Sequence, residues 1–354
     1  MNNIERIRLA LPDYECDAML VTSPIARLYA TGFMSSAGVL LVTARAAWFL
    51  ADSRYFEAAK KAVAGAHVSL VAKDETFAER INALLGESAI GKLGFEDGFV
   101  TYSGYLEWTE KLETKLIPAQ KLVDGLRAVK SRDDLEKMVK AQRIAEKTFD
   151  DILPLIAMGI SEKQLATELV YRALRNGADD KSFDPIVVSG KRSSLPHGVP
   201  GNEKIGEGFL TIDFGVRLNG WCSDMTRTLC VGSPDDEMIK VYDTVLEAQE
   251  AGIRAVRGGV KGFDVDKAAR DVIESAGFGE YFGHGFGHSL GLEVHESLKA
   301  SRISEDVLPS GAVVSAEPGI YLPGRYGVRI EDVLYITEEG SENITNTTKD
   351  LIII

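Results

Sequence analysis

The dipeptide Asn219-Gly220 lies between two runs of strand-forming residues and constrains how this chain folds. Asn-Gly is a preferred sequence for a two-residue hairpin turn, because both central positions need a positive φ. A turn here pairs the strands so that Asp213 faces Thr226. Asp224 then shares a sheet face with Asp213 as its diagonal neighbour, roughly 7–8 Å away at the backbone. Two such carboxylates can hold a pair of metal ions; the alternative is two exposed acids that flank a turn.

A second predicted connection, centred on Gly324, places Glu317 directly opposite Glu331. Like charges that face each other across strands repel, so this arrangement is stable only with cations between the carboxylates. Arg329 lies two residues from Glu331 and shares its face. A surface ion pair between Arg329 and Glu331 is the alternative, since such pairs are common and weak, but it leaves Glu317 unexplained.

Histidine is scarce in this chain and concentrated in one segment. Of the five histidines, His284, His288 and His295 lie in a single glycine-rich stretch, and a fourth is His197. Neutral imidazole is both a metal ligand and a proton carrier near pH 7. The glycines disfavour a helix, so we expect an extended strand with His284 and His288 on one face and a bend at Gly291 that brings in His295. Together with the four carboxylates, these histidines predict a metal centre.

The length of 354 residues favours two domains. In the first, residues 1–125, short apolar strands alternate with helical patterns, which is typical of a three-layer α/β domain. The expected strands are Ala18–Thr22, Val39–Thr43, Ala47–Ala51, Val68–Ala72 and Lys92–Glu96, and the expected helices are Ser53–Val63, Phe77–Leu85 and Ser103–Lys115.

The second domain, residues 126–354, repeats one arrangement. A pair of helices is followed by a strand hairpin, and each of the two hairpins carries one carboxylate pair. The first helix opens at Ser131, a favourable N-cap with acidic residues in the first turn. We therefore expect a duplicated αβ unit, and an α/β (α+β) fold class for the whole chain.

The net charge of −13 argues against nucleic acid or an anionic membrane as the main partner. Three cysteines without CxxC spacing favour reduced thiols in a cytoplasmic protein. The N-terminal residues suit the start of an amphipathic helix rather than a signal peptide. The most apolar stretch, Gly38–Ala51, is too short to span a bilayer.

Five local motifs follow one another in the second half: Asp213-Phe-Gly, Ser223-Asp224-Met-Thr-Arg-Thr, His284-Gly-Phe-Gly-His288-x-x-Gly-Leu-x-Val-His295-Glu, Glu317-Pro-Gly-Ile-Tyr321 and Val328-Arg329-Ile-Glu331-Asp332. They resemble those of the pita-bread metallopeptidases, the family of methionine aminopeptidase, aminopeptidase P and prolidase. Two weaker motifs in the first half, Arg27-Leu-Tyr-Ala-Thr-Gly-Phe33 and Phe49-Leu-Ala-Asp52-Ser-Arg-Tyr55, resemble the creatinase-type N-terminal cap domain of the prolidase and aminopeptidase P branch, which methionine aminopeptidases lack.

This resemblance implies a dinuclear metal centre. Asp213 would bind one ion, Asp224 and Glu331 would bridge both, and His288 and Glu317 would complete opposite ends. Two divalent ions offset the four carboxylates; Mn or Co is expected, and such ligands also accept Zn or Fe. A hydroxide that bridges the ions would be the nucleophile, and Glu317 would carry a proton to the leaving amine.

The resemblance also implies roles on the substrate side. His197 and His295 would steady the substrate and the oxyanion. Three further residues match positions near the proline side of the substrate or behind the metal ligands: His284, Tyr321 and Arg329. For Arg329, the alternative is a purely structural role as a counter-ion.

The segment after Glu296 departs from the short proline-containing turn of the relatives and carries Lys299 and Arg302. Either cation can bind the free carboxylate of a dipeptide, or simply remain solvated. The expected activity is hydrolysis of Xaa-Pro bonds at peptide N-termini, on small peptides with proline in the second position. An Xaa-Pro dipeptidase is favoured, and aminopeptidase P activity on longer peptides is the alternative.

Two further implications concern assembly and class. Relatives with this cap domain are usually homodimers, so the resemblance predicts a homodimer. Some pita-bread proteins are metal-free, either creatinase-like hydrolases or chaperone modules that only bind proteins. Those proteins have lost metal ligands, whereas this chain keeps all five positions, so a metal-free binding module is the less favoured alternative.

Overall fold

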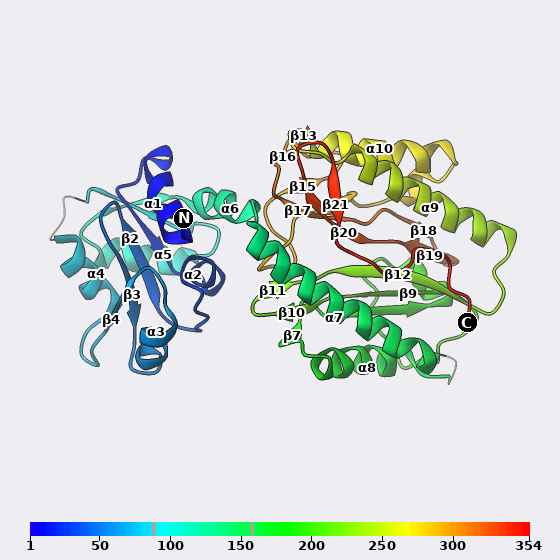
Figure 1. Cartoon of the computed structure of the whole chain (residues 1–354), viewed down its shortest axis with the longest axis horizontal. Helices are drawn as coiled ribbons and strands as arrows, with labels where there is room; N and C mark the ends of the chain where they lie inside the picture. The colour runs from blue at the N-terminus through cyan, green and yellow to red at the C-terminus, as the bar shows by residue number, and fades with distance from the viewer. Residues whose placement is uncertain (87–89, 157–158) are drawn as a thin grey trace. The chain divides into compact units, whose positions relative to one another are not determined.

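In the computed structural model, which describes residues 1–86, 90–156 and 159–354, the chain divides into two units between Arg127 and Ala128. Unit 1 is Met1–Arg127 and unit 2 is Ala128–Ile354, and Figure 1 draws both. This division lies close to residue 125, where the sequence pattern changes.

A six-stranded sheet forms the middle layer of unit 1, in the strand order β4-β3-β2-β1-β5-β6. β2 runs antiparallel to both of its neighbours, while the other neighbouring strands are parallel. The strands are β1 (Ala18–Val21), β2 (Val39–Thr43), β3 (Ala47–Ala51), β4 (His67–Leu70), β5 (Lys92–Phe95) and β6 (Lys115–Pro118).

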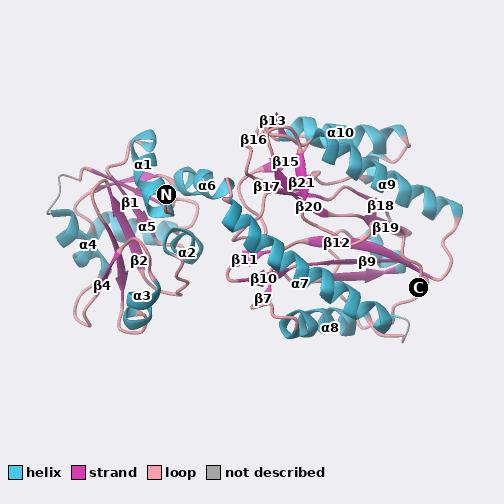
Figure 2. Ribbon diagram, in the orientation of Figure 1, coloured by secondary structure: helices cyan, strands magenta, loops and turns pink. Residues whose placement is uncertain are grey.

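Helices cover both faces of this sheet (Figure 2). Alternate residues of β1 point to opposite faces: Met19 and Val21 pack in one core with α1, α2, α3 and α6, whereas Ala18 and Leu20 pack in the other with α4 and α5. The predicted three-layer α/β domain is therefore confirmed. The helices are α1 (Asn3–Ala10), α2 (Pro24–Thr31), α3 (Phe56–Ala62), α4 (Phe77–Gly86), α5 (Tyr102–Lys111) and α6 (Gln120–Ala128).

The prediction of a helix over Ser103–Lys115 was wrong at its C-terminal end. Helix α5 ends at Lys111, and the chain then forms β6, which pairs in parallel with β5 and places Leu116 beside Leu93. Leu116 is buried there, and Pro118 lacks the N–H that a helix needs. Pairing at the sheet edge therefore outweighs the local helix pattern.

Unit 2 packs two pairs of helices against two groups of strands (Figures 1 and 2). α7 and α8 share a core with β8, β9 and β12, and α9 and α10 share a second core with β17 to β20. The predicted order of helix pair, hairpin, helix pair and hairpin is confirmed. The helices are α7 (Arg132–Ile156), α8 (Glu162–Arg175), α9 (Asp236–Ala255) and α10 (Gly262–Ser275).

The strands of unit 2 form several small sheets rather than one continuous one. They are β7 (Asp180–Lys181), β8 (Ile186–Ser189), β9 (Gly208–Phe214), β10 (Val216–Leu218), β11 (Trp221–Cys222), β12 (Met225–Val231), β13 (Val260–Lys261), β14 (Gly287–His288), β15 (Lys299–Ala300), β16 (Val307–Leu308), β17 (Val313–Ala316), β18 (Gly319–Leu322), β19 (Tyr326–Arg329), β20 (Asp332–Ile336) and β21 (Ser341–Asn343).

The first hairpin forms with the predicted turn and register. Asn219 and Gly220 have φ angles of 51° and 86°, the positive values that a tight hairpin turn requires. In the ladder between β9 and β12, Asp213 lies beside Thr226. The turn dipeptide therefore fixed which residues of the two strands face each other.

The second hairpin also has the predicted register. The pairing of β17 with β20 and the pairing of β18 with β19 follow one register on either side of Glu317 and Glu331, so these two residues stand opposite each other. The chain reverses at Gly324, whose φ is 71°, a conformation that favours glycine.

The prediction of an extended histidine-rich strand was wrong. Only Gly287–His288 is a strand, and residues 289–298 form a closed loop in which the Ser289 N–H donates to the Leu298 carbonyl at 2.8 Å. Within that loop, the Gly291 N–H donates to the Glu293 carbonyl at 2.9 Å. Glycine permits such turns as readily as an extended strand, and the alternation pattern does not distinguish them.

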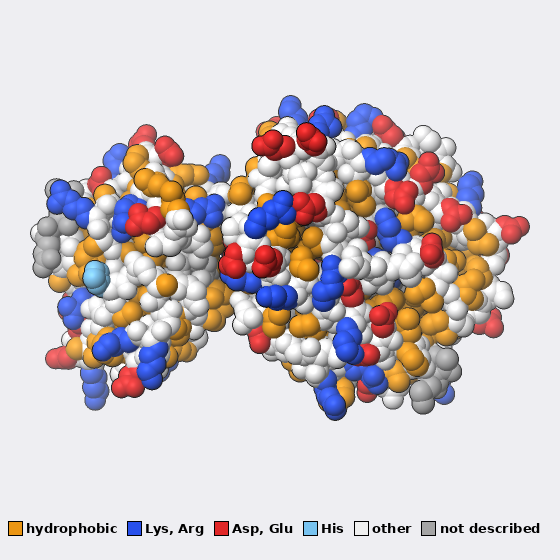
Figure 3. Space-filling model, in the orientation of Figure 1, with side chains coloured by type: hydrophobic (Ala, Val, Ile, Leu, Met, Phe, Trp, Pro, Cys, Tyr) orange, Lys and Arg blue, Asp and Glu red, His pale blue; other side chains and the backbone are white. Residues whose placement is uncertain are grey.

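Acidic and basic side chains are interspersed over the face of unit 2 that Figure 3 shows. Among the described residues, no helix is long and apolar enough to cross a membrane. A cavity of about 730 Å³ lies in unit 1, beside the ends of β3 and β4 and lined by side chains such as Phe77 and Trp108, and it contains none of the predicted site residues.

Candidate metal centre

Four carboxylates from the two hairpins converge in unit 2. Asp213 lies in β9 and Asp224 precedes β12, while Glu317 follows β17 and Glu331 precedes β20. The exposed fractions of Asp213, Asp224 and Glu331 are 8%, 4% and 1%. Burial raises the pKa of Asp224 and Glu331 well above the ordinary range, and repulsion from the neighbouring acids adds to the rise. Acids buried this close together need cations to remain ionised.

The orphaned oxygens of this cluster fit a divalent metal. Within the part of the chain that the structure describes, no hydrogen-bond partner reaches Asp213 Oδ1, Asp224 Oδ1 or Glu331 Oε1, although all three are buried. Asp224, His288 and Glu331 each offer a ligand atom within 4.8 Å of the others. Carboxylate oxygens with an imidazole nitrogen suit Mn, Co, Zn or Fe. Three of the five predicted ligands are thus already close enough to share one ion.

His288 presents one ring nitrogen to the acids. Its Nε2 lies 3.2 Å from Glu317 Oε1 and 3.7 Å from Asp224 Oδ2, while Nδ1 lies 3.3 Å from the Ser289 carbonyl oxygen. With a proton on Nδ1, the carbonyl fixes the tautomer and leaves the Nε2 lone pair free for a metal. Burial lowers the pKa of His288, but the hydrogen bond to Glu317 and the charge of Glu317 outweigh burial, so that the pKa is raised overall.

Glu317 is the most acidic member of the cluster. Burial raises its pKa, but the hydrogen bond from His288 and the charges of His288, His284 and Arg329 outweigh burial and lower the pKa to about 2. Ser315 also donates its hydroxyl to Glu317 Oε1 at 3.1 Å. Glu317 is therefore ionised at neutral pH and held in one orientation.

Arg329 joins the two hairpins through their acids. Its Nη2 donates to Asp213 Oδ2 at 2.6 Å, and its Nε donates to Thr226 Oγ1 at 3.2 Å. Thr226 in turn donates its hydroxyl to Glu331 Oε2 at 2.8 Å. Arg329 is 3% exposed, so it serves as a buried counter-ion that contacts Asp213 directly and Glu331 through the Thr226 hydroxyl.

His284 and Tyr321 extend this network. His284 Nδ1 lies 2.8 Å from the Gly285 carbonyl and Nε2 lies 2.9 Å from the Tyr321 hydroxyl. Arg329 Nη1 donates to the same hydroxyl at 2.7 Å. The consistent arrangement has a proton on Nδ1, so that Tyr321 accepts from Arg329 and donates to His284. Burial lowers the pKa of His284 and raises that of Tyr321 to about 12, which keeps both neutral.

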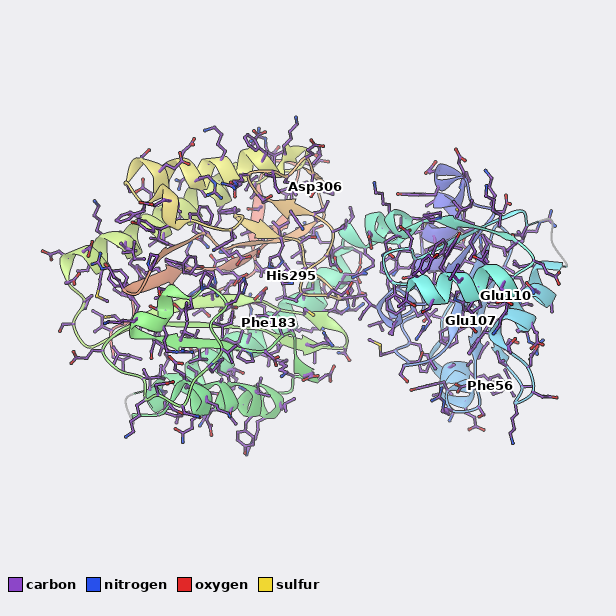
Figure 4. All side chains as sticks on the ribbon, turned by 180° about the vertical axis from the view of Figure 1, so that it is seen from behind. Phe56, Glu107, Glu110, Phe183, His295 and Asp306 are labelled. Atoms are coloured by element: carbon purple, nitrogen blue, oxygen red, sulfur yellow. The ribbon has the colours of Figure 1, made fainter. Side chains whose placement is uncertain are left out.

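His295 lies on the loop between β14 and β15 (Figure 4). Its ring centroid is 4.2 Å from that of His288, with an angle of 58° between the rings. Burial lowers the pKa of His295, and the charges of His288, His197 and Lys299 contribute to the decrease. His197 is exposed, in the loop after the short helix Gly190–Ser194. The structure thus brings His295 to His288 and leaves His197 at the surface nearby.

The two predicted loop cations have different positions. Lys299 pairs with His288 across the β14–β15 ladder, and its side chain is exposed. Arg302 follows three positions later in an exposed turn. Both side chains are exposed, and the charge of Lys299 contributes to lowering the pKa of His295.

Sequence reasoning missed several residues that support the site. Thr226 and Ser315 hold Glu331 and Glu317 through their hydroxyls. Thr226 had a usable signal, because the hairpin register already placed it opposite Asp213. Lys130 and Glu296, which form an ion pair at 2.7 Å, lie far apart in the sequence and had no such signal.

Two protein-family models match the chain. The model of metallopeptidase family M24 matches residues 136–338, in unit 2. The model of the creatinase/prolidase N-terminal domain matches residues 3–129, which cover almost all of unit 1.

Similar proteins align over nearly the full length of the chain. The structure of an Xaa-Pro dipeptidase from Bacillus anthracis has a TM-score of 0.96 and 41% identity, and the match covers 99% of both chains. The structure of an X-Pro aminopeptidase from Thermotoga maritima has a TM-score of 0.92 and 32% identity, over 99% of this chain and 100% of that one. An Xaa-Pro dipeptidase from Pyrococcus horikoshii is 36% identical over 95% of this chain and 94% of its own length. The predicted fold class, with two different domains, is confirmed.

Proposed function

The chain belongs to metallopeptidase family M24, and we propose that it is a dinuclear exopeptidase that hydrolyses Xaa-Pro bonds at peptide N-termini, acting as an Xaa-Pro dipeptidase. The observation that carries this proposal is the buried cluster of four acids and His288, in which three carboxylate oxygens of the described residues lack a donor. Such a cluster is costly unless cations occupy it.

Asp213, Asp224, His288, Glu317 and Glu331 would hold two divalent ions, for which we propose Mn or Co. When bound, the ions lower the pKa of a water nucleophile and polarise the scissile carbonyl. Arg329 and Thr226 keep Asp213 and Glu331 in fixed orientations, because each of these acids has one oxygen occupied by a donor.

Glu317 is the proposed proton carrier. Its low pKa makes it a carboxylate at neutral pH, so it begins as a base. It takes a proton from the attacking water and delivers that proton to the proline nitrogen as the C–N bond breaks. Because the Ser315 hydroxyl donates to Oε1 of Glu317, Oε2 is the oxygen available for this transfer.

His295 and His197 would steady the reacting carbonyl. As the carbonyl oxygen gains negative charge, an imidazole N–H that points at it stabilises that charge. Tyr321 is buried, His284 is half-buried, and both are neutral; we assign them to the wall that receives the proline ring. A rigid ring enters a preformed slot with little loss of conformational freedom.

The choice between dipeptides and longer peptides depends on the loop cations. A free C-terminal carboxylate on a dipeptide would meet Lys299 or Arg302, both of which are exposed at the β14–β15 edge. The names of the relatives support both alternatives, since one similar structure is called an Xaa-Pro dipeptidase and another an X-Pro aminopeptidase. We favour the dipeptidase and keep the aminopeptidase as the second candidate.

We also propose that the protein is a homodimer, as the family resemblance implies, and that it is located in the cytoplasm. The latter rests on Cys16, Cys222 and Cys230, which are free and buried thiols, a state suited to a reducing compartment.

A peptide panel tests the proposal. The manganese-loaded protein is expected to cleave Ala-Pro faster than Ala-Pro-Ala, and both much faster than Met-Ala-Ser. Arg302→Ala should slow the cleavage of Ala-Pro more than that of Ala-Pro-Ala. Lys299→Ala, measured in the same way, tests the other loop cation. Faster cleavage of Met-Ala-Ser would contradict proline specificity. Equal rates on the two proline peptides in all three proteins would replace the dipeptidase with the aminopeptidase.

A further inference from the structure

We infer that the buried ion pair between Lys130 and Glu296 fixes the position of His295 over His288, so that both members of the pair are positioning residues of the metal centre. The expected effect on catalysis rests on the proposed function. The expected effect on the position of His295 rests on the geometry of the loop that carries it.

The ion pair is almost completely removed from water. Lys130 Nζ lies 2.7 Å from Glu296 Oε2, and the two side chains are 1% and 5% exposed. Lys130 Nζ also donates to the Ala128 carbonyl at 3.2 Å. The backbone N–H of Lys130 donates to the Gly311 carbonyl at 2.8 Å. Lys130 is therefore an anchored cation at the base of the loop.

Glu296 ties the loop to that anchor. Its other oxygen, Oε1, accepts the backbone N–H of Leu292 at 3.2 Å. Its own N–H donates to the Ser289 carbonyl at 2.7 Å. The loop is closed again where Leu298 donates its N–H to Ser289 Oγ at 2.9 Å. Glu296 thus binds Leu292 and the Lys130 anchor through its carboxylate and Ser289 through its backbone.

Gly291 shows how closely the loop packs on the ion pair. A β-carbon at this position would lie 2.8 Å from Glu296 Oε1 and 2.9 Å from Lys130 Cε. Real β-carbons do not come this close to other atoms, so any larger residue would displace the pair. The loop backbone therefore rests directly on the two charged side chains.

His295 is the residue whose position this arrangement controls. It immediately precedes Glu296, and its ring lies against that of His288, 4.2 Å between centroids. The His295 side chain is exposed, so it depends on its backbone for placement more than on packing around the ring. A shift of about 1 Å in a reacting group can cost on the order of 100-fold in rate.

The test combines Lys130→Met with a His295→Ala background. Lys130 contacts the loop through Glu296, so the ion pair is the route by which Lys130→Met should act on His295. In the wild-type background, Lys130→Met and Glu296→Gln should each lower kcat on Ala-Pro by roughly 10- to 100-fold with KM changed less than about twofold. In the His295→Ala background, neither substitution should lower kcat further. An equal loss in both backgrounds would overturn the inference.

A second readout does not require peptidase activity. In zinc-loaded protein labelled with ¹⁵N-histidine, Lys130→Met should move the ring resonances of His295 and leave those of His67 unchanged. Leu169→Ala, a truncation in the core of α8, provides a destabilised control that should move neither. An unmoved His295 signal in Lys130→Met would refute the inference that the ion pair positions His295. If the wild-type protein cleaves no Xaa-Pro peptide, the proposed function fails while this spectrum still decides the inference.

Each single variant removes one charge of a buried ion pair and can therefore unfold the protein. The double variant Lys130→Met with Glu296→Gln removes both charges and retains an acceptor for Leu292. It should melt close to the wild-type temperature and still show the displaced His295 signal and the lower kcat. Wild-type kcat in this folded double variant would contradict the inference.

Discussion

Replacement of Thr226 by valine tests how this residue of the first hairpin orients Glu331, a proposed metal ligand of the second hairpin. The Thr226 hydroxyl accepts a hydrogen bond from Arg329 Nε at 3.2 Å and donates one to Glu331 Oε2 at 2.8 Å. Valine has nearly the same shape but neither bond. Burial raises the pKa of Glu331, the other acids raise it further, and the hydrogen bond from Thr226 opposes that rise. Thr226→Val should therefore make Glu331 still harder to ionise.

The magnitude follows from one charge-assisted hydrogen bond. Such a bond contributes about 1.5–3 kcal/mol, and each 1.4 kcal/mol is about tenfold in an equilibrium constant. We expect Thr226→Val to weaken Mn²⁺ binding by roughly 10- to 100-fold, a range typical for residues that orient metal ligands. The loss should be larger at lower pH, because metal binding requires Glu331 to lose its proton.

Calorimetric titration of the chelator-stripped protein with Mn²⁺ measures this effect. Thr226→Ser is the matched control, since it keeps the hydroxyl and removes only a methyl group. The serine variant should bind Mn²⁺ within about threefold of the wild type. Wild-type affinity in Thr226→Val, or an equal loss in both variants, would refute the role assigned to the hydroxyl.

Three other predictions address separate parts of the account. Glu317→Gln should leave the melting temperature near that of the wild type but lower turnover at least about 100-fold, as expected for loss of a general base; near-normal turnover would remove Glu317 from proton transfer. Because the pKa of Glu331 is raised in the folded protein, the metal-free wild type loses stability as pH rises above the ordinary carboxyl range. Metal-free Glu331→Gln should therefore melt at a higher temperature than the wild type at pH 8, and this advantage should disappear near pH 4; an advantage independent of pH would contradict the assignment. Light scattering at micromolar concentration should give the mass of a dimer, and a monomer with unchanged specific activity on dilution would exclude it.

The two hairpin registers were predictable because local signals define them. Asn219-Gly220 specifies a tight turn, and the period of two along a strand then decides which residues share a face. The same logic around Gly324 placed Glu317 opposite Glu331. Two acids that face each other also imply a cation, so the register itself predicts a metal centre at this place.

Other features depend on contacts between distant segments and had no local signal. β6 forms because Leu116 finds a partner strand in β5, which overrides the helix pattern around it. The loop that carries His295 closes on Ser289 and rests on Lys130, and neither contact is visible in the spacing of its glycines. The counter-ion role of Arg329 was considered from sequence, but its bond to Asp213 required the two hairpins to be brought together.

A titration of the chelator-stripped protein with Mn²⁺, with Ala-Pro hydrolysis measured at each addition, tests the central claim most directly. The account predicts negligible hydrolysis without metal and a rate that rises until about two ions are bound per chain, the number that offsets four buried carboxylates. Undiminished hydrolysis of Ala-Pro by demonstrably metal-free protein, or no hydrolysis with two ions bound, would contradict it.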